Sequence, residues 1–200
     1  MNPIEALNRS AFLWVNASGE TPAWAIKLAS IIADDFILLI PLLLIMLWLW
    51  GDDVKRNVTL KACLVVLIGL GLNQLIGLVW QHPRPSMAGL GHTWIAHAAD
   101  SSFPSDHMTV LSGVSVTLLF DGMVGLGLVT LALGLSVAWV RVFLGVHFPM
   151  DMVGAIIVAI LAYLFIHPIW LRVGNTITGW LLKPYRQVLS RPIAAGWVRS

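Results

Sequence analysis

Charged residues are scarce in this sequence of 200 amino acids. They make up 11% of the chain, against roughly 25% in a typical soluble domain, whereas apolar residues make up 58%. This composition excludes an ordinary soluble domain and predicts an integral membrane protein. A helix needs about 20 residues to cross the hydrocarbon core, so the length allows five or six crossings. We therefore expect one membrane domain over residues 1–200, with no large soluble domain.

Cysteine is almost absent too. Cys63 is the only one and lies in an apolar stretch, which excludes an internal disulfide and a cysteine-based metal cluster. The formal net charge of +2 is too small to indicate nucleic acid as a partner. The first twenty residues have neither the basic start nor the unbroken apolar core of a cleavable signal peptide, so we expect the N-terminus to be retained.

Long apolar runs predict an all-α bundle of five to six transmembrane helices. The expected crossings are residues 23–50, 58–80, 105–120, 123–142 and 149–171, and residues 3–17 and 174–191 are expected to form interfacial helices. Three lysines and arginines lie between the first two crossings and five follow the last, which is eight of the twelve in the chain. That side should be cytoplasmic. The 81–104 segment and the 141–149 turn should then share the extracytoplasmic face.

Three short motifs hold most of the polar residues that suggest chemistry, and all fall at that predicted face: HPRPS (82–86), FPSDH (103–107) and RVFLGVHFPMD (141–151). Pro104 and Pro149 each precede an apolar run, which predicts that each is the first residue of a helix. The N-terminus of a helix presents unpaired N–H groups and a partial positive charge, so it attracts anions. We expect N–H groups near Ser105 and Asp106 to hold such an anion.

The side chains in these motifs predict phosphoryl transfer. Arg84 and Arg141 carry planar guanidinium groups that match phosphate oxygens. His147 precedes Asp151 by four residues, so the carboxylate can orient the imidazole as a nucleophile. His107 then remains to protonate the departing oxygen. The expected reaction passes through a phosphohistidine that water hydrolyses.

Simpler explanations exist for single residues of this kind. A histidine at a membrane edge is commonly just an interfacial residue, and arginine commonly extends toward lipid headgroups. Arg84 and Arg141, however, lie on the predicted face that is poor in positive charge. Their position there favours a functional role for the pair.

The motifs resemble those of a known family, the type-2 phosphatidic-acid phosphatase superfamily, over about residues 60–160. The matching residues are Arg84-Pro85, Pro104-Ser105-Asp106-His107 and Arg141-x5-His147-x3-Asp151. The stretch AHAADSSFPSDH is similar to undecaprenyl pyrophosphate phosphatases of the bacitracin-resistance type. The resemblance implies a six-helix arrangement and hydrolysis with no metal ion or other cofactor. It also implies roles for six residues: His147 as nucleophile, Asp151 as its partner, His107 as general acid, and Arg84, Ser105 and Arg141 as phosphate ligands.

The sequence departs from the family pattern at three positions. The family usually has a lysine seven residues before the arginine of its first motif, but this chain has Gly77. Asp106 stands where glycine is common, and its role is left open, while Val140 replaces a frequent serine. The missing cation could be replaced at the second phosphate of a pyrophosphate by one of three residues: His82, Gln81 or His97.

Two further patterns concern packing. Asn73 and Gln74 lie within a predicted span, where polar side chains usually face the bundle interior, so we expect hydrogen bonds between helices. Small residues allow close approach of helices, and we expect packing within one bundle, in preference to dimerisation, at the glycines in and beside the predicted spans, numbered 69, 71, 77, 122, 125, 127 and 134.

The leading hypothesis is a membrane phosphatase that removes the terminal phosphate of undecaprenyl pyrophosphate on the outer face of a bacterial cytoplasmic membrane, recycling the carrier lipid for cell-wall synthesis. The expected partners are this polyprenyl pyrophosphate and membrane lipids. An alternative substrate is phosphatidylglycerol phosphate or phosphatidic acid. A non-catalytic lipid transporter or headgroup-binding protein would use the same arginines, and a haloperoxidase would need vanadate. The sequence leaves lipid preference and oligomeric state open.

Overall fold

The computed structural model describes residues 2–98 and 100–200, so Ala99 of the AHAADSSFPSDH stretch lies outside it. Within the described residues all regular secondary structure is helical, which confirms the predicted fold class. The elements are α1 Pro3–Val15, α2 Ala23–Asp35, the short 3-10 helix η1 Phe36–Leu38, α3 Leu39–Trp50, α4 Asp53–Val79, α5 Asp106–Phe120, α6 Val124–Phe143, α7 Pro149–Val188 and α8 Ser190–Ala194.

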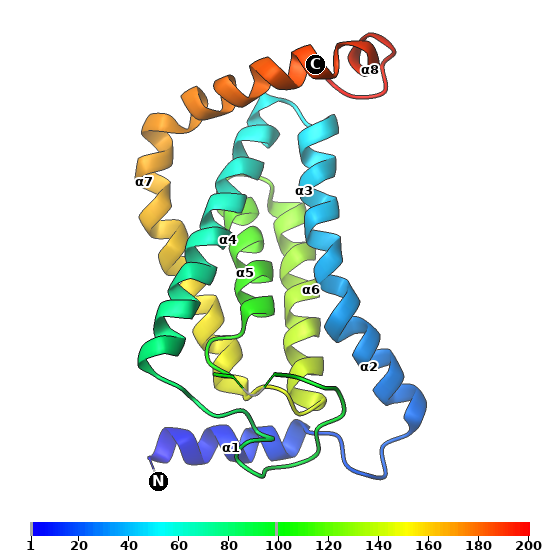
Figure 1. Ribbon diagram of the computed structural model, residues 1–200, viewed down its shortest axis with the longest axis vertical. Helices are drawn as coiled ribbons and strands as arrows, with labels where there is room; N and C mark the ends of the chain where they lie inside the picture. The colour runs from blue at the N-terminus through cyan, green and yellow to red at the C-terminus, as the bar shows by residue number, and fades with distance from the viewer. Residues whose placement is uncertain (1, 99) are drawn as a thin grey trace.

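In the part of the chain that the structure describes, four helical stretches are long and apolar enough to cross a membrane. They are Ala23–Trp50, Asp53–Val79, Val124–Phe143 and Pro149–Val188. The remaining predicted crossing, residues 105–120, is α5, which has only 15 residues and would extend about 22 Å. It lies within the bundle (Figure 1). The chain is therefore a multi-pass membrane protein in which one central helix is shorter than the bilayer core.

The last predicted crossing and the interfacial helix after it form one element. The sequence predicted separate segments at 149–171 and 174–191, but α7 runs without a break from Pro149 to Val188. A straight helix of 40 residues would extend about 60 Å, twice the hydrocarbon thickness. The C-terminal half of α7 instead turns aside and runs across one end of the bundle (Figure 1). Pro168 lies inside the helix, where proline removes a hydrogen bond and favours a bend.

The helix predicted at residues 3–17 is α1, and it lies across the opposite end of the bundle (Figure 1). Asn2 caps it by accepting a hydrogen bond from Ile4 N at 3.1 Å. One side of α1 exposes Ile4, Leu7 and Trp14, while Asn8 and Phe12 are buried. This pattern suits a helix that lies along a membrane surface.

Helix α5 forms the centre of the core. Leu111, Val114 and Leu118 on this helix are fully buried. Close packing at glycine is confirmed at some of the predicted positions: a Cβ atom on Gly134 of α6 would lie 3.2 Å from Leu111 Cβ, whereas Gly125 of the same helix has no neighbour within 4 Å. The bundle therefore uses only some of its glycines for helix contact.

The two predicted helix starts differ in the structure. Pro149 is the first residue of α7, as predicted. The prediction for Pro104 is wrong, because α5 begins at Asp106 with Ser105 as its N-cap. The N-cap position places Ser105 in an extended backbone conformation just before the helix, so Pro104 belongs to the preceding loop.

The two loops that carry the motifs lie at the same end of the bundle, as the sequence predicted. Trp94 N donates to Leu144 O at 3.0 Å, and Arg84 Nη1 donates to Val146 O at 2.9 Å. These bonds join the segment after α4 to the turn between α6 and α7. Side chains from three distant parts of the chain are thereby brought together.

Polar groups also gather at the opposite end of the bundle. Lys61 is buried, with its Nζ atom 2.8 Å from Asp121 and 2.7 Å from His167 Nδ1. Lys61 is therefore a paired cation inside the helix bundle and not a loop residue facing headgroups. The cluster links α4, the turn before α6, and α7.

Candidate active site

The motif residues come from five places that meet at the α1 end of the bundle. Arg84 lies in the loop after α4, and His107 lies in the first turn of α5. Arg141 lies in the last turn of α6. His147 is in the loop before α7, whose first turn contains Asp151.

The imidazole of His147 is oriented by the carboxylate of Asp151. His147 Nδ1 lies 3.1 Å from Asp151 Oδ2, which also accepts a hydrogen bond from Phe148 N at 2.8 Å. An ionised carboxylate can only accept a hydrogen bond, so with Asp151 ionised the imidazole proton lies on Nδ1 and the lone pair on Nε2. His147 is only 3% exposed. The geometry is that of an oriented histidine nucleophile with Nε2 as the reacting atom.

The guanidinium group of Arg84 lies directly beside that reacting atom. Arg84 Nη1 is 3.2 Å from His147 Nε2, and Arg84 Nε donates to Asp100 Oδ1 at 2.8 Å. Arg84 Nη2 reaches the backbone oxygen of Ser101 at 3.4 Å. Asp100 could not be predicted from the sequence, because its carboxylate reaches Arg84 only through the path of the long loop.

Arg141 forms the other cationic side of the cluster. Its side chain is buried, with Nη1 donating to Ala33 O at 3.3 Å and Nη2 lying 2.9 Å from His97 Nε2. Its Nε atom is buried with no hydrogen-bond partner among the described residues. The rings of His97 and His147 are 5.9 Å apart, so His97 belongs to this cluster.

The N-terminus of α5 contributes a second set of groups. The Ser105 hydroxyl is fully buried, and its oxygen has no hydrogen-bond partner in the described part of the chain. The N–H of Ser105 itself donates to Asp151 O at 3.3 Å. The N–H groups of Asp106 and His107 have no partner within their own helix, since they belong to its first turn.

Burial and nearby positive charge lower the pKa of two histidines in the loops, His147 and His97. Burial lowers the pKa of His147 well below its usual value of 6.5, and the nearby guanidinium groups of Arg141 and Arg84 lower it further. Burial and the same two arginines also lower the pKa of His97. Both imidazoles are therefore neutral at neutral pH, which leaves the His147 lone pair available.

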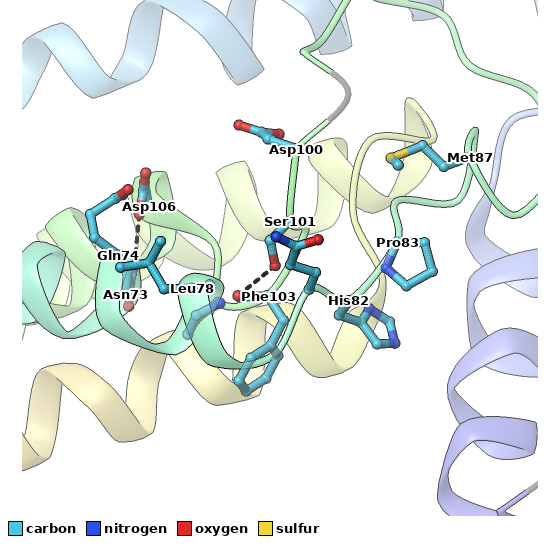
Figure 2. Close-up of a pocket in the computed structure, with 13 residues that line it drawn as sticks. Asn73, Gln74, Leu78, His82, Pro83, Met87, Asp100, Ser101, Phe103 and Asp106 are labelled. Atoms are coloured by element: carbon cyan, nitrogen blue, oxygen red, sulfur yellow. Dashed lines mark hydrogen bonds between the residues drawn. The ribbon is translucent and has the colours of Figure 1, made fainter.

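Asp106 is turned toward α4. Its Oδ1 atom accepts a hydrogen bond from Asn73 Nδ2 at 2.8 Å, and the same amide donates to Thr109 Oγ1 at 2.9 Å. The predicted hydrogen bonding of Asn73 between helices is confirmed. Figure 2 shows Asn73 and Asp106 facing each other across this contact. The carboxylate is thus held by an amide donor at the start of α5.

A cavity of about 440 Å³ lies between the end of α4 and the loop that follows (Figure 2). Gly77 contributes to its wall, at the position where a lysine side chain is absent, and so do Gln81 and His82. Two carboxylates, Asp100 and Asp106, also line it. Gln81 and His82 thus lie at this cavity and not with His97. The structure separates the three candidates for a second phosphate into two places.

His82 is held in place from both sides. Its Nδ1 atom lies 3.0 Å from Ser102 Oγ, and its Nε2 atom lies 3.4 Å from Glu5 Oε2 of α1. These contacts tie the first motif to the residue just before the second motif and to α1. His82 therefore joins neighbouring segments at the edge of the catalytic cluster.

Comparison with known proteins identifies a family and curated relatives. The model of a family described as the PAP2 superfamily matches residues 58–174. The chain is 36% identical over 197 residues to the putative undecaprenyl-diphosphatase YbjG of Escherichia coli (strain K12), covering 98% of this chain and all of that protein. It is 40% identical over 120 residues to the undecaprenyl-diphosphatase BcrC of Bacillus subtilis (strain 168), covering 60% of this chain and 62% of that one.

Two solved structures share the fold. The crystal structure of Aquifex aeolicus LpxE has a TM-score of 0.65 at 18% identity and covers 80% of this chain and 93% of its own. A PAP2-type phosphatidylglycerolphosphate phosphatase from Bacillus subtilis has a TM-score of 0.62 at 19% identity and covers 84% and 87%. At these identities the likeness establishes the helical architecture alone, in agreement with the predicted membrane bundle.

Proposed function

The chain belongs to the PAP2 superfamily and is a membrane phosphatase, and from that premise we propose that it removes the terminal phosphate of undecaprenyl pyrophosphate. The names of two relatives, YbjG and BcrC, support this choice of lipid. The observation that carries the chemistry is the pairing of His147 with Asp151 beside Arg84. We further propose that residues 1–200 act as one domain.

The first step is attack on the terminal phosphorus by His147 Nε2. The incoming phosphate takes the Arg84 Nη1 donor away from Nε2, which frees the lone pair for the new N–P bond. Arg84, Arg141 and Ser105 hold the equatorial oxygens. The unpaired Arg141 Nε and Ser105 hydroxyl are suited to this role, because a phosphate would supply the acceptor that each lacks.

The second group to act is His107. The bond between the terminal phosphorus and the bridging oxygen breaks as the N–P bond forms, and His107, protonated in the complex with the anionic pyrophosphate, gives its proton to that oxygen. Undecaprenyl phosphate leaves. Neutral His107 then takes a proton from water, whose oxygen attacks the phosphohistidine and releases inorganic phosphate with His147 restored.

His97 is the best placed of the three candidates for the second phosphate. It lies against Arg141, where the two arginines supply positive charge. Gln81 and His82, in contrast, line a cavity to which no lysine or arginine of the described residues contributes. We expect His97→Ala to reduce hydrolysis of the pyrophosphate more than hydrolysis of a lipid monophosphate. Equal losses on the two substrates would contradict this role.

The site is proposed to face the outside of a bacterial cytoplasmic membrane. The basic residues of the C-terminal half of α7 and of the first turn of α4 lie at the other end of the bundle, which favours a cytoplasmic position for that end. The pyrophosphate would then enter at the α1 end, with the polyprenyl chain along the apolar helices. Such a reaction recycles the carrier lipid for cell-wall synthesis.

The decisive experiment measures phosphate release from undecaprenyl pyrophosphate in detergent with excess chelator. The wild-type chain should turn over, whereas His147→Ala should lose about 10³-fold or more in kcat. His92→Ala is the matched control, because His92 lies at the same end of the bundle, in the loop after α4, but stacks on Trp94 outside the cluster. A strict need for added divalent metal, or full activity in His147→Ala, would overturn the proposed mechanism.

Two alternatives are separated by the same assay. If phosphatidylglycerol phosphate or phosphatidic acid is hydrolysed faster than the polyprenyl substrate, the lipid assignment fails while the phosphohistidine chemistry stands. A transporter or headgroup-binding protein would release no phosphate from any of the lipids. It would also keep much of its lipid binding in His147→Ala, because Arg84 and Arg141 remain.

A further inference from the structure

The first turn of α7 needs a capping group that its own sequence does not provide. The N-cap residue is Phe148, whose phenyl ring cannot accept a hydrogen bond. Pro149 has no N–H group, and the N–H of Asp151 bonds to Phe148 O at 3.1 Å. The N–H of Met150 is therefore the donor in this turn that needs an acceptor from elsewhere.

Asn8 of α1 supplies that acceptor. Its Oδ1 atom accepts from Met150 N at 3.0 Å, although the two residues are 142 positions apart. Asn8 is only 2% exposed, so its amide is fixed within the protein. One turn further along α1, Phe12 packs edge-to-face against Phe148 at 5.3 Å between ring centroids. An amide and an aromatic ring from α1 thus hold the beginning of α7.

The capped turn is the one that orients the proposed nucleophile. Met150 directly precedes Asp151, and Asp151 Oδ2 contacts both Phe148 N and His147 Nδ1. We propose that Asn8 is a positioning residue for His147, acting through the first turn of α7 and Asp151. This inference rests on the proposed function, because it assigns His147 as the nucleophile.

The role of Asn8 follows from the two tautomers of a neutral imidazole. Asp151 keeps the proton on His147 Nδ1 only while its carboxylate stays in place. Without the Asn8 bond, the first turn of α7 loosens and the proton is shared between Nδ1 and Nε2. A proton on Nε2 blocks the lone pair that forms the N–P bond. Loss of the cap should therefore slow formation of the phosphohistidine without weakening phosphate binding by Arg84 and Arg141.

Contacts other than the Asn8 hydrogen bond hold α1, and with it Asn8, in place. Asn16, just after α1, donates to Phe143 O at 3.0 Å and to His92 O at 2.9 Å. Ala17 N also donates to Phe143 O at 2.9 Å. The α1 helix is thus attached independently to the end of α6 and to the loop after α4, so a change at Asn8 alone should leave α1 docked.

The test compares Asn8→Leu, which removes the acceptor at similar size, with Asn8→Asp, which keeps an oxygen acceptor and suits a helix N-terminus. Ser10→Ala is the control, because Ser10 is exposed on the same helix. We expect Asn8→Leu to lower kcat about 10- to 100-fold with KM changed less than about 2-fold. We expect Asn8→Asp to remain within about 3-fold of the wild type in kcat. Rapid-quench measurement of the phosphoenzyme should show that the first step is the slowed one.

A second readout needs no substrate. Nitrogen NMR of ¹⁵N-labelled histidine in detergent, with His147 assigned by its loss in His147→Ala, should show the Nδ1–H tautomer in the wild type and a mixture in Asn8→Leu. Unchanged tautomer and kcat in Asn8→Leu, or failure of Asn8→Asp to restore both, would overturn the inference. If Asn8→Leu does not fold, Asn8→Ala takes its place in both measurements. A wild type that lacks phosphatase activity but shows this tautomer shift would contradict the proposed function and leave the positioning by Asn8 standing.

Discussion

Asp151 connects the folding of α7 with the proposed chemistry. One carboxylate oxygen accepts both the N–H of Phe148, at the helix start, and Nδ1 of His147. Its backbone oxygen accepts from Ser105 N, at the start of α5. A single residue therefore orients the proposed nucleophile and joins the two helix N-termini that border the proposed phosphate site.

The Asp151→Asn variant tests this connection. The amide has nearly the shape of the carboxylate, but its NH₂ group can donate to His147 Nδ1 and drive the imidazole proton to Nε2. We expect kcat to fall by about 10²- to 10⁴-fold with a smaller change in KM. Phosphate release from the lipid pyrophosphate measures this loss. A kcat within a few-fold of the wild type would show that the carboxylate does not set the tautomer.

The pH dependence of kcat/KM tests the environment of His147. The pKa of His147 lies well below 6.5 because of burial and the nearby arginines, so its proton binds only at lower pH. The neutral, nucleophilic form therefore persists through neutral pH and is lost as the pH falls through the lowered pKa. The acidic limb of kcat/KM, which reports the free enzyme, should lie below pH 6.5. A midpoint at or above that value would contradict the environment described for His147.

Some residues of the site could be predicted from the sequence and others could not. His147 and Asp151 are four residues apart across a helix start that Pro149 marks, so their contact can be predicted from sequence spacing alone. Asp100 and Asn8 act through contacts that depend on the path of a long loop and on the docking of α1. Hydrophobic patterns give no information on such distant pairs.

At the scale of the elements, the packing of α5 determines where the first turn of this helix lies. Its buried side chains face α4, α6 and α7, and the short helix carries Ser105 and His107 at its start. On one side, Gly134 of α6 allows Leu111 and Met108 to approach closely. The position of the proposed general acid therefore depends on the contact between α5 and α6.

Substitution of glycines on α6 tests this dependence. Gly134→Leu would place a large side chain against Leu111 and Met108, whereas Gly125→Leu on the same helix has open space. We expect Gly134→Leu to lower the free energy of unfolding by about 1–3 kcal/mol. Gly125→Leu should change it by less than about 0.5 kcal/mol. Unfolding in mixed detergent micelles measures both, and equal effects would show that the contact does not limit packing.

The elements themselves were predictable where apolar runs are long and bounded by breakers. The apolar stretches 23–50 and 123–142 correspond closely to α2–η1–α3 and α6. The continuity of α7 was not predictable, because Pro168 and the more polar sequence after residue 171 suggest an end to the helix. Helical hydrogen bonds continue through a bend, which composition alone does not reveal.

At the scale of the whole molecule, the two ends of the bundle differ in their polar groups. The α1 end holds the histidine and arginine cluster with the long loop. At the other end, the buried Arg56 guanidinium donates to Trp48 O at 2.9 Å and to Arg199 O at 2.6 Å, which attaches the C-terminal segment to α3. The proposed reaction requires that the α1 end face the outside of the cell and that the end with Arg56 face the cytoplasm.

Cysteine labelling tests this orientation. In a Cys63→Ser background, Met87→Cys places a thiol on an exposed side chain of the loop after α4, and Trp197→Cys places one on an exposed side chain after α8. A membrane-impermeant maleimide should label position 87 in intact cells and position 197 only after permeabilisation, because the positive-inside pattern assigns the basic end to the cytoplasm. Phosphate release by each variant controls for folding. Labelling of position 197 but not 87 in intact cells would show that the orientation is the reverse of the proposed one. The histidine cluster would then face the cytoplasm, where it could not act on a lipid pyrophosphate of the outer leaflet.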